Sequence, residues 1–334
     1  MHMLQILELF GGIGSPRVAL RNLGIPVKAI DYVEIDAKAV RSYNAMFASE
    51  LPYKTQSVIG YNLQPDILIH GSPCQTFSIA GHQGGLTKEN GRINRGAGAD
   101  EGSGSQSSLM WETVNIIKQM GEWKPKIVIW ENVKNITSKY MIHNFVKYLN
   151  VMEEMGYTNS YECLDARDFG IPQARERVFT ISCLNGTKFN FKTLKHTKMR
   201  PLQNFLEDNV SERYLVTQPS ILSTIGNTKT IKRATVIKDY VYTITERQDR
   251  CPAQIIDVGN GKYRFLTELE CWRLFGYSDD DYYAAEAANP KRKNAIVNRT
   301  LYRQAGNSIV VPIFESIFEQ CLNILNYNKA TVEE

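Results

Sequence analysis

One apolar segment limits what this chain can fold into more than any other, because it ends in a break followed by a cysteine. Residues 66–78 are Asp-Ile-Leu-Ile-His-Gly-Ser-Pro-Cys-Gln-Thr-Phe-Ser. A short apolar run after a Pro-Asp turn is typical of a buried parallel strand. Pro73 fixes its own backbone and restricts Ser72, so Cys74 would be held on a stiff turn past the carboxyl end of that strand. Ligands gather at this edge in open α/β sheets, so the segment indicates a reactive thiol there. A small apolar residue at a strand end fits this segment alone equally well.

A glycine-rich turn near the N-terminus favours the same kind of sheet. Residues 4–10 predict a first strand, and Gly11-Gly12-Ile13-Gly14 predicts a tight turn into a helix. Residues 29–35 predict a second strand that closes on Glu34. A glycine turn after strand one and an acid at the end of strand two form the nucleoside-binding arrangement of a doubly wound sheet. Arg17 stands in place of the third glycine of the dinucleotide fingerprint, so the pattern favours a nucleoside cofactor without a diphosphate.

Charged residues follow two later predicted strands. Residues 127–130 predict a strand that ends on Glu131, at the same sheet edge as Cys74. A single acid in such a place is more often a helix cap. Arg175 and Arg177 alternate on an extended segment and are therefore expected to point the same way. They suit a fork that grips an anion or a carbonyl oxygen, although solvated surface arginines fit the same pattern.

Composition limits the class of protein. The chain has 334 residues, 43% hydrophobic and 22% charged, which is typical of a soluble protein with one large and one smaller domain. The net charge of +4 means that a polyanionic partner would have to meet a local basic patch. Six scattered cysteines without metal-ligand spacing predict reduced thiols, no disulfide framework and no metal site. Without a signal peptide or a membrane-spanning apolar run, we expect a cytoplasmic protein.

The character of the sequence changes along the chain and predicts three parts. Residues 1–184 predict a catalytic and cofactor-binding domain, with a glycine-rich mobile loop at 81–108 that a disordered linker would also explain. Residues 185–298 predict a second, smaller domain. Its basic first part, 185–262, suits a polyanion, and a solvated β-rich insertion is the alternative. Residues 299–334 predict a C-terminal helix that returns to the first domain.

Seven short strings in this sequence resemble the cytosine-5 DNA methyltransferases of prokaryotic or phage type, which use S-adenosylmethionine. They cover nearly the whole chain in the family's order: Glu8-Leu9-Phe10-Gly11-Gly12-Ile13-Gly14, Glu34, Gly71-Ser72-Pro73-Cys74-Gln75, Glu131-Asn132-Val133, Gln173-Ala174-Arg175-Glu176-Arg177, Arg264-Phe265-Leu266-Thr267 and Gly306-Asn307-Ser308. One such string could arise by chance, whereas seven in order are specific. The resemblance implies an α/β fold, a doubly wound Rossmann-like methyltransferase sheet with a second, smaller β-rich target-recognition domain. It assigns the target-recognition role, with a hinge, to residues 185–298.

The resemblance also implies a reaction on a cytosine flipped out of double-stranded DNA. Cys74 would attack carbon 6, and Glu131 would hydrogen-bond ring nitrogen 3 and the exocyclic amine. Arg175 and Arg177 would grip the cytosine carbonyl oxygen and steady the edge of the site. The implied contacts with S-adenosylmethionine are Phe10, Gly12, Ile13, Gly14, Glu34, Ile35, Pro73, Leu109, Asn307 and Ser308.

Three departures from the family's pattern concern the cofactor and the loop. Ser57-Val58-Ile59 stands where the family usually carries an acid for the adenine amine. Gln106 replaces a common arginine near the end of the loop, and Ala80 stands where some members carry a serine. The sequence therefore does not determine how tightly the cofactor binds or how readily the loop closes.

The sequence leaves several alternatives for the function. A tRNA cytosine-5 methyltransferase of the same fold would share every catalytic residue. A nucleotide-dependent oxidoreductase is disfavoured by the missing third glycine, and an inactive DNA-binding protein is disfavoured by the intact catalytic residues. We expect a monomer that acts on double-stranded DNA without a membrane or a metal. The recognised DNA sequence, and whether a cognate restriction endonuclease acts separately, stay open.

Overall fold

The computed structural model of the chain describes most of its residues. The described ranges are 4–47, 53–55, 57–58, 65–71, 87–89, 92–94, 109–139, 141–226, 233–248 and 253–327, with backbone alone at 28–31, 87–89 and 92–94. Pro73, Cys74, Ala80 and Gln106 lie outside the described residues, and so does most of the 81–108 loop. The predictions made for them stay predictions.

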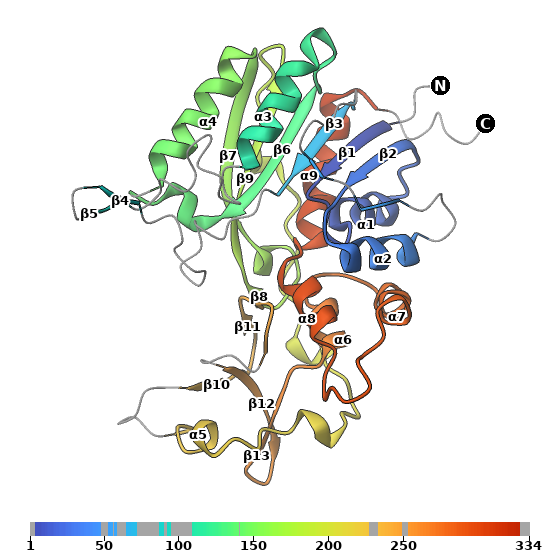
Figure 1. Cartoon of the computed structure of the whole chain (residues 1–334), viewed down its shortest axis with the longest axis vertical. Coiled ribbons are helices and arrows are strands. Elements are labelled where there is room, and N and C mark those ends of the chain that lie inside the picture. The colour runs from blue at the N-terminus through green and yellow to red at the C-terminus, as the bar shows by residue number, and fades with distance from the viewer. Residues whose placement is uncertain are drawn as a thin grey trace.

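A six-stranded mixed sheet forms the centre of the larger part of the molecule (Figure 1). In spatial order its strands are β2 (Val27–Val33), β1 (Leu4–Leu9), β3 (Ile67–His70), β6 (Ile127–Val133), β9 (Glu176–Leu184) and β7 (Tyr157–Asp165). The first four are parallel, whereas β9 is antiparallel to both of its neighbours. The strand order reverses between β1 and β3, so a ligand crevice is expected outside their carboxyl ends.

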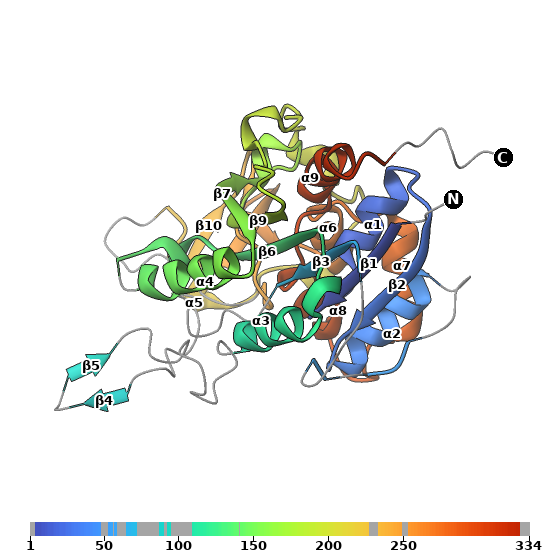
Figure 2. The same cartoon turned by 90° about the horizontal axis from the view of Figure 1, so that it is seen from above.

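Helices cover both faces of this sheet. The helices α1 (Ser15–Asn22), α2 (Ala37–Met46) and α9 (Val311–Ile324) share one core cluster, and α3 (Met110–Gln119) and α4 (Ile142–Glu154) share the other. Figure 2 shows α3 and α4 on the side of the sheet opposite to α1 and α9. Side chains alternate along the strands, so Ile6 packs toward α1 and Leu7 toward α3. The same alternation places Glu8 and Glu131 on the α1 face.

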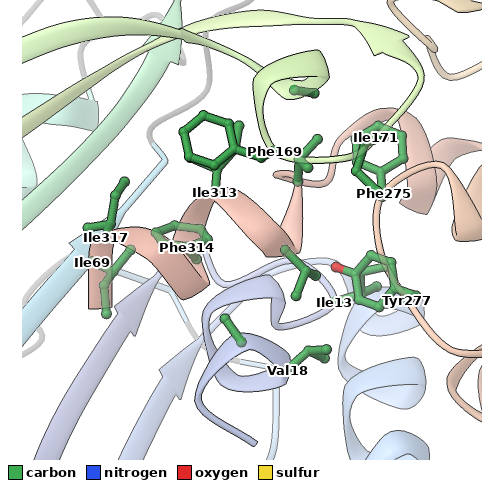
Figure 3. Packing of buried hydrophobic residues seen from close by; sticks show 14 of the residues in the cluster. Ile13, Val18, Ile69, Phe169, Ile171, Phe275, Tyr277, Ile313, Phe314 and Ile317 are labelled. Atoms are coloured by element: carbon green, nitrogen blue, oxygen red, sulfur yellow. The ribbon is translucent and has the colours of Figure 1, made fainter. Parts of the chain in front are cut away.

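Segments distant in the sequence meet in the core on the α1 face. Figure 3 shows Ile69 near Phe314 and Ile13 near Tyr277, and Val18 of α1 belongs to the same cluster. All five side chains are buried. The N-terminal strands and the last helix therefore share one hydrophobic core.

The smaller part of the molecule is built around a three-stranded sheet (Figure 1). Its elements are β10 (Ala234–Val236), β12 (Ala253–Gly259) and β13 (Lys262–Phe265), with the short helix α5 (Pro219–Leu222) nearby. β11 (Val241–Tyr242) pairs in parallel with β8 (Gln173–Ala174) and so connects the two parts. β4 (Thr87–Glu89) and β5 (Arg92–Asn94) form a separate antiparallel pair.

Three helices follow the small sheet and return to the larger part. They are α6 (Glu268–Arg273), α7 (Asp279–Ala288) and α8 (Arg299–Gly306). Arg21 of α1 donates to both carboxylate oxygens of Asp281 in α7, at 2.8 and 2.7 Å, and α7 also packs against α2. These contacts favour a boundary earlier than residue 298, and the exact division into domains stays a proposal.

Several elements have bounds that differ from those predicted. β2 ends at Val33, so Glu34 follows the strand instead of belonging to it. β6 continues to Val133, so Glu131 lies within the strand. The sequence pattern predicted a parallel sheet, but β6 has an antiparallel partner, β9, in which Phe179 lies opposite Glu131. The predicted C-terminal part, 299–334, holds two helices: α8 ends at Gly306, and α9 starts at Val311 with a proline in its first turn.

Candidate active site

A cavity lies at the carboxyl edge of β1 and β3, on the α1 face. Its volume is about 170 Å³. Its walls include six residues predicted for the cofactor and one predicted for the base: Phe10, Gly12, Ile13, Glu34, Asn307, Ser308 and Glu131. The structure therefore brings the two ends of the chain together around one space. Gly14, Ile35 and Leu109 do not line it.

The turn between β1 and α1 requires glycine for close contact with two tyrosine rings. A Cβ atom on Gly11 would lie 2.5 Å from the ring of Tyr32, and one on Gly14 would lie 2.5 Å from the ring of Tyr43. Phe10, which lines the cavity, has a positive φ of 55°. Such a backbone is costly for an aromatic residue, by about 1–3 kcal/mol, and is typical of ligand sites.

Glu34 is fixed by the backbone around it. Its Oε2 accepts from the N–H of Gly12 at 2.9 Å, and its Oε1 accepts from the N–H groups of Ile35 and Asp36 at 2.8 Å each. The carboxylate thus joins the glycine turn to the end of β2 and keeps one orientation at the cavity wall. Ile35 itself is 72% exposed.

The opposite wall of the cavity is formed by the end of α8 and the residues after it. Arg303 forms an ion pair with Asp36, so this wall is tied to the β2 side. Asn307 donates to Glu246 at 3.2 Å. A Cβ atom on Gly306 would lie only 2.4–2.6 Å from the backbone of Thr245 and Glu246, so the segment after β11 approaches α8 as closely as a glycine allows.

Glu131 and Arg177 form an ion pair at the other end of the cavity, with Nε and Oε1 3.2 Å apart. Burial raises the pKa of Glu131, while Arg177 and then Arg175 lower it. Gly71 lies beside this carboxyl group, and a Cβ atom on it would make an ordinary contact of 3.6 Å with Glu131 Oε2. The acid is thus held in place beside the strand end that leads to Cys74.

Arg175 has different surroundings from Arg177, although the two were predicted to act alike. It is 4% exposed, and its guanidinium donates to the backbone carbonyls of Ile244, Gly306 and Ser308 at 2.9–3.2 Å. Its guanidinium carbon also lies 4.8 Å from the centre of the Phe275 ring. These contacts fit the predicted steadying role better than a direct grip on a base.

Two buried ionisable residues were not predicted from the sequence as site residues. Glu8 is 1% exposed and lines the cavity; Tyr43 donates to its Oε2 at 2.8 Å, and Oε1 has no hydrogen-bond partner among the described residues. Burial raises the pKa of Glu8 to about 7. A single acid inside an apolar strand is the sequence signal that could have identified it. His70 is fully buried with its pKa lowered to about 3, so it stays neutral.

Two predicted features are only partly described. Leu109 is half-buried at the start of α3. Ser57, where the family usually has an acid, is exposed, and Val58 beside it is buried. Within the described ranges no group of three or more histidine, cysteine, aspartate or glutamate side chains could hold a metal ion. No described helix is long and apolar enough to cross a membrane.

The described residues fit S-adenosylmethionine as a ligand of this cavity. The fixed carboxylate of Glu34 suits ribose hydroxyls, and the glycine turn leaves backbone accessible beside it. The free Oε1 of buried Glu8 can accept a hydrogen bond from a cationic group. The cavity continues to Glu131, so a ligand bound along it would reach the ion pair with Arg177.

Comparisons with known proteins agree with this geometry. A family model described as C-5 cytosine-specific DNA methylase matches residues 4–323. The type II methyltransferase M2.ScrFI of Lactococcus lactis subsp. cremoris is 29% identical, over 95% of this chain and 99% of its own length. The orphan methyltransferase M.SPBetaI of Bacillus phage SPbeta is 26% identical, over 97% and 98%. The crystal structure of S. pombe Dnmt2 shares the fold with a TM-score of 0.72 at 18% identity, covering 97% of this chain and 100% of that one.

Proposed function

The chain belongs to the C-5 cytosine-specific DNA methylase family, and from this premise we propose how its residues transfer a methyl group to cytosine in duplex DNA. The enzyme is a DNA cytosine-5 methyltransferase, and its relatives include type II methyltransferases. The observation that carries the proposed site is the cavity that runs from the Glu34 wall to Glu131. An oxidoreductase on the same sheet is not favoured.

The proposed cofactor is S-adenosylmethionine, held between the glycine turn and the end of α8. Glu34 would accept hydrogen bonds from the ribose, and Phe10 would pack against the adenine. Asn307 and Ser308 would contact the methionine end. When bound, S-adenosylmethionine supplies a methyl group carried on a positively charged sulfur. Ile35, Pro73, Leu109 and the backbone of the turn stay proposed contacts.

The proposed reaction begins with Cys74. Its thiolate would add to carbon 6 of a flipped-out cytosine, which makes carbon 5 nucleophilic. Glu131 would hydrogen-bond ring nitrogen 3 and the exocyclic amine and so stabilise the charge that develops on the ring. After carbon 5 has taken the methyl group it loses its proton to solvent, and the bond to Cys74 breaks. Arg177 orients Glu131 in this scheme, and Arg175 holds the edge of the site.

Trapping with a modified base tests this assignment. Cytosine with fluorine at carbon 5 cannot lose that substituent, so wild type should form an adduct with such duplex DNA that survives denaturants. Cys74→Ser should form none, because a hydroxyl is a much weaker nucleophile at neutral pH. An equal yield of adduct from the variant would reject Cys74.

Substrate choice needs a parallel assay. Labelled cofactor offered with unmethylated duplex DNA and with tRNA should label the DNA, and bisulfite sequencing should then give the recognised sequence. Label in tRNA alone would favour the alternative. We propose that residues 185–262 select the sequence and that the enzyme acts as a cytoplasmic monomer, with or without a cognate restriction endonuclease.

A further inference from the structure

A chain of hydroxyl groups connects the two walls of the cofactor cavity. Ser15, beside the glycine turn, and Ser308, after α8, both line the cavity. Between them lies the hydroxyl of Tyr277, 2.6 Å from Ser15 Oγ and 3.3 Å from Ser308 Oγ. Tyr277 is 4% exposed, and in Figure 3 its oxygen points toward the turn that carries Ile13.

The hydrogen bonds in this series of hydroxyl groups can all run in one direction. The backbone N–H of Ile309 donates to Ser15 Oγ at 3.3 Å, and the hydroxyl of Tyr277 donates to Ser308. Ser308 donates to the carbonyl of Gln304 at 2.8 Å. With its one proton given to Ser308, Tyr277 accepts from Ser15. Burial raises the pKa of Tyr277, so its hydroxyl keeps that proton.

Ser308, at one end of this series of hydroxyl groups, is connected to the predicted base-binding segment. The carbonyl of Ser308 accepts from Arg175 at 2.9 Å, and the same guanidinium donates to the carbonyl of Ile244, which follows β11. Gln173 accepts from the N–H of Ile244 at 3.1 Å and donates to the carbonyl of Leu274, three residues before Tyr277, at 2.8 Å. A displacement of Ser308 therefore changes the support of Arg175 and of the smaller part.

We infer that Tyr277 is a positioning residue whose hydroxyl couples the cofactor cavity to the segment that holds the target base. This inference rests on the proposed function. A cofactor that contacts Ser308 fixes the position that Arg175 needs, and DNA bound at the edge of the site that Arg175 steadies positions Ser308, through Arg175, for the cofactor. Since such coupling is reciprocal, each ligand strengthens the binding of the other.

Replacement of Tyr277 by phenylalanine tests the inference without removal of the ring. Each serine keeps another partner, Ile309 or Gln304, so the variant should fold. The matched control is Tyr282→Phe, which removes a buried tyrosine hydroxyl that donates to Glu286 at 3.2 Å, away from the cavity. The measurement is the Kd of S-adenosylhomocysteine by titration calorimetry, without and with a saturating duplex that carries the sequence found by bisulfite analysis.

The ratio of the two Kd values is the result that matters. In wild type and in Tyr282→Phe, DNA should lower the Kd by about tenfold, within the usual range of coupling between two sites. In Tyr277→Phe the ratio should fall to about twofold or less, and Ser308→Ala in that background should reduce it no further. A purely structural defect would weaken both measurements equally and leave the ratio unchanged.

Two outcomes would overturn the inference. One is an unchanged ratio in Tyr277→Phe; the other is a wild type that methylates DNA yet shows a ratio of one. A wild type that does not methylate DNA at all would instead reject the proposed function. The methylation assay and the Kd ratio thus separate the two failures.

Discussion

Arg177 Nε lies 3.2 Å from Glu131 Oε1, and the two side chains are only 16% and 13% exposed. They come from adjacent antiparallel strands, in which Arg177 lies opposite Val133. The ion pair occupies one oxygen of Glu131, while the other is close to Gly71. The acid is therefore oriented before any base arrives, as electrostatic stabilisation of a transition state requires.

Glu131→Gln should lower the rate of methyl transfer and leave cofactor binding nearly intact. An amide keeps the shape of the side chain and can still donate a hydrogen bond, but it cannot transfer a proton to ring nitrogen 3, which is worth about 10²–10⁴ in rate. Single-turnover methylation measures the rate, and calorimetric titration measures the affinity. A variant that loses affinity and keeps its rate would place Glu131 in the cofactor site instead.

Substitution of Arg175 and substitution of Arg177 should have different effects. Arg175→Met removes a charged donor from two buried carbonyls and one part-buried carbonyl, so the free energy of unfolding should fall by about 2–4 kcal/mol. Arg177→Met leaves the carboxylate of Glu131, which is only 13% exposed, without its ion-pair partner, so it should also destabilise the fold, by about 3–5 kcal/mol, and in addition raise the pKa of Glu131 and slow single turnover. Urea unfolding measures the stability of both variants, and the pH profile of single-turnover methylation measures the change in pKa. A larger shift of that profile in Arg175→Met than in Arg177→Met would contradict the distinction.

Much of this fold follows from sequence patterns because they are local. Short apolar runs gave β1, β3 and β6, and the carboxyl ends of parallel strands meet at one edge. Phe10 and Glu34, each at the end of a predicted strand, therefore share a cavity with Ser308. The family resemblance supplied their roles, which local patterns alone did not.

The missed features depend on partners that are distant in the sequence. In the sequence, Arg175 fits a solvated or a ligand-binding arginine equally well. In the structure its guanidinium donates to the carbonyls of Ile244 and Ser308, which are distant in the sequence. Tyr277 carries no local signal, because its bond to Ser15 spans 262 positions. Only tertiary packing makes such contacts, so no window of sequence predicts them.

Gly306→Ala should damage both stability and activity. The added methyl group would meet the backbone of Thr245 and Glu246 at 2.4–2.6 Å, so one of the two segments must move, at about 1–3 kcal/mol. Gly71→Ala is the control for fold stability, since its methyl group would meet only ordinary contacts at 3.6–3.7 Å. Thermal unfolding should separate the two variants by several degrees. A Gly306→Ala protein as stable as Gly71→Ala would show that the close approach is not required.

The buried carboxyl of Glu8 should make the stability of the ligand-free protein depend on pH. Its pKa is about 7 in the folded protein against an ordinary value of 4.5, mainly because of burial, opposed by the bond from Tyr43 and by Arg17. The folded protein thus holds this proton in a range where the unfolded chain has released it. The contribution of Glu8 to stability is therefore fully present below about pH 4.5 and is lost as the pH rises from about 4.5 to about 7.

Glu8→Gln removes this titration and keeps an oxygen to accept from Tyr43. Between pH 5.5 and pH 8, wild type should lose about 2 kcal/mol more of its unfolding free energy than the variant does. Urea unfolding at the two pH values gives the difference, and Glu122→Gln, at an exposed carboxyl, should keep the wild-type dependence. If Glu8→Gln shows the same pH dependence as wild type, Glu8 is ionised in the folded protein, and its free oxygen must have a partner that compensates for its burial.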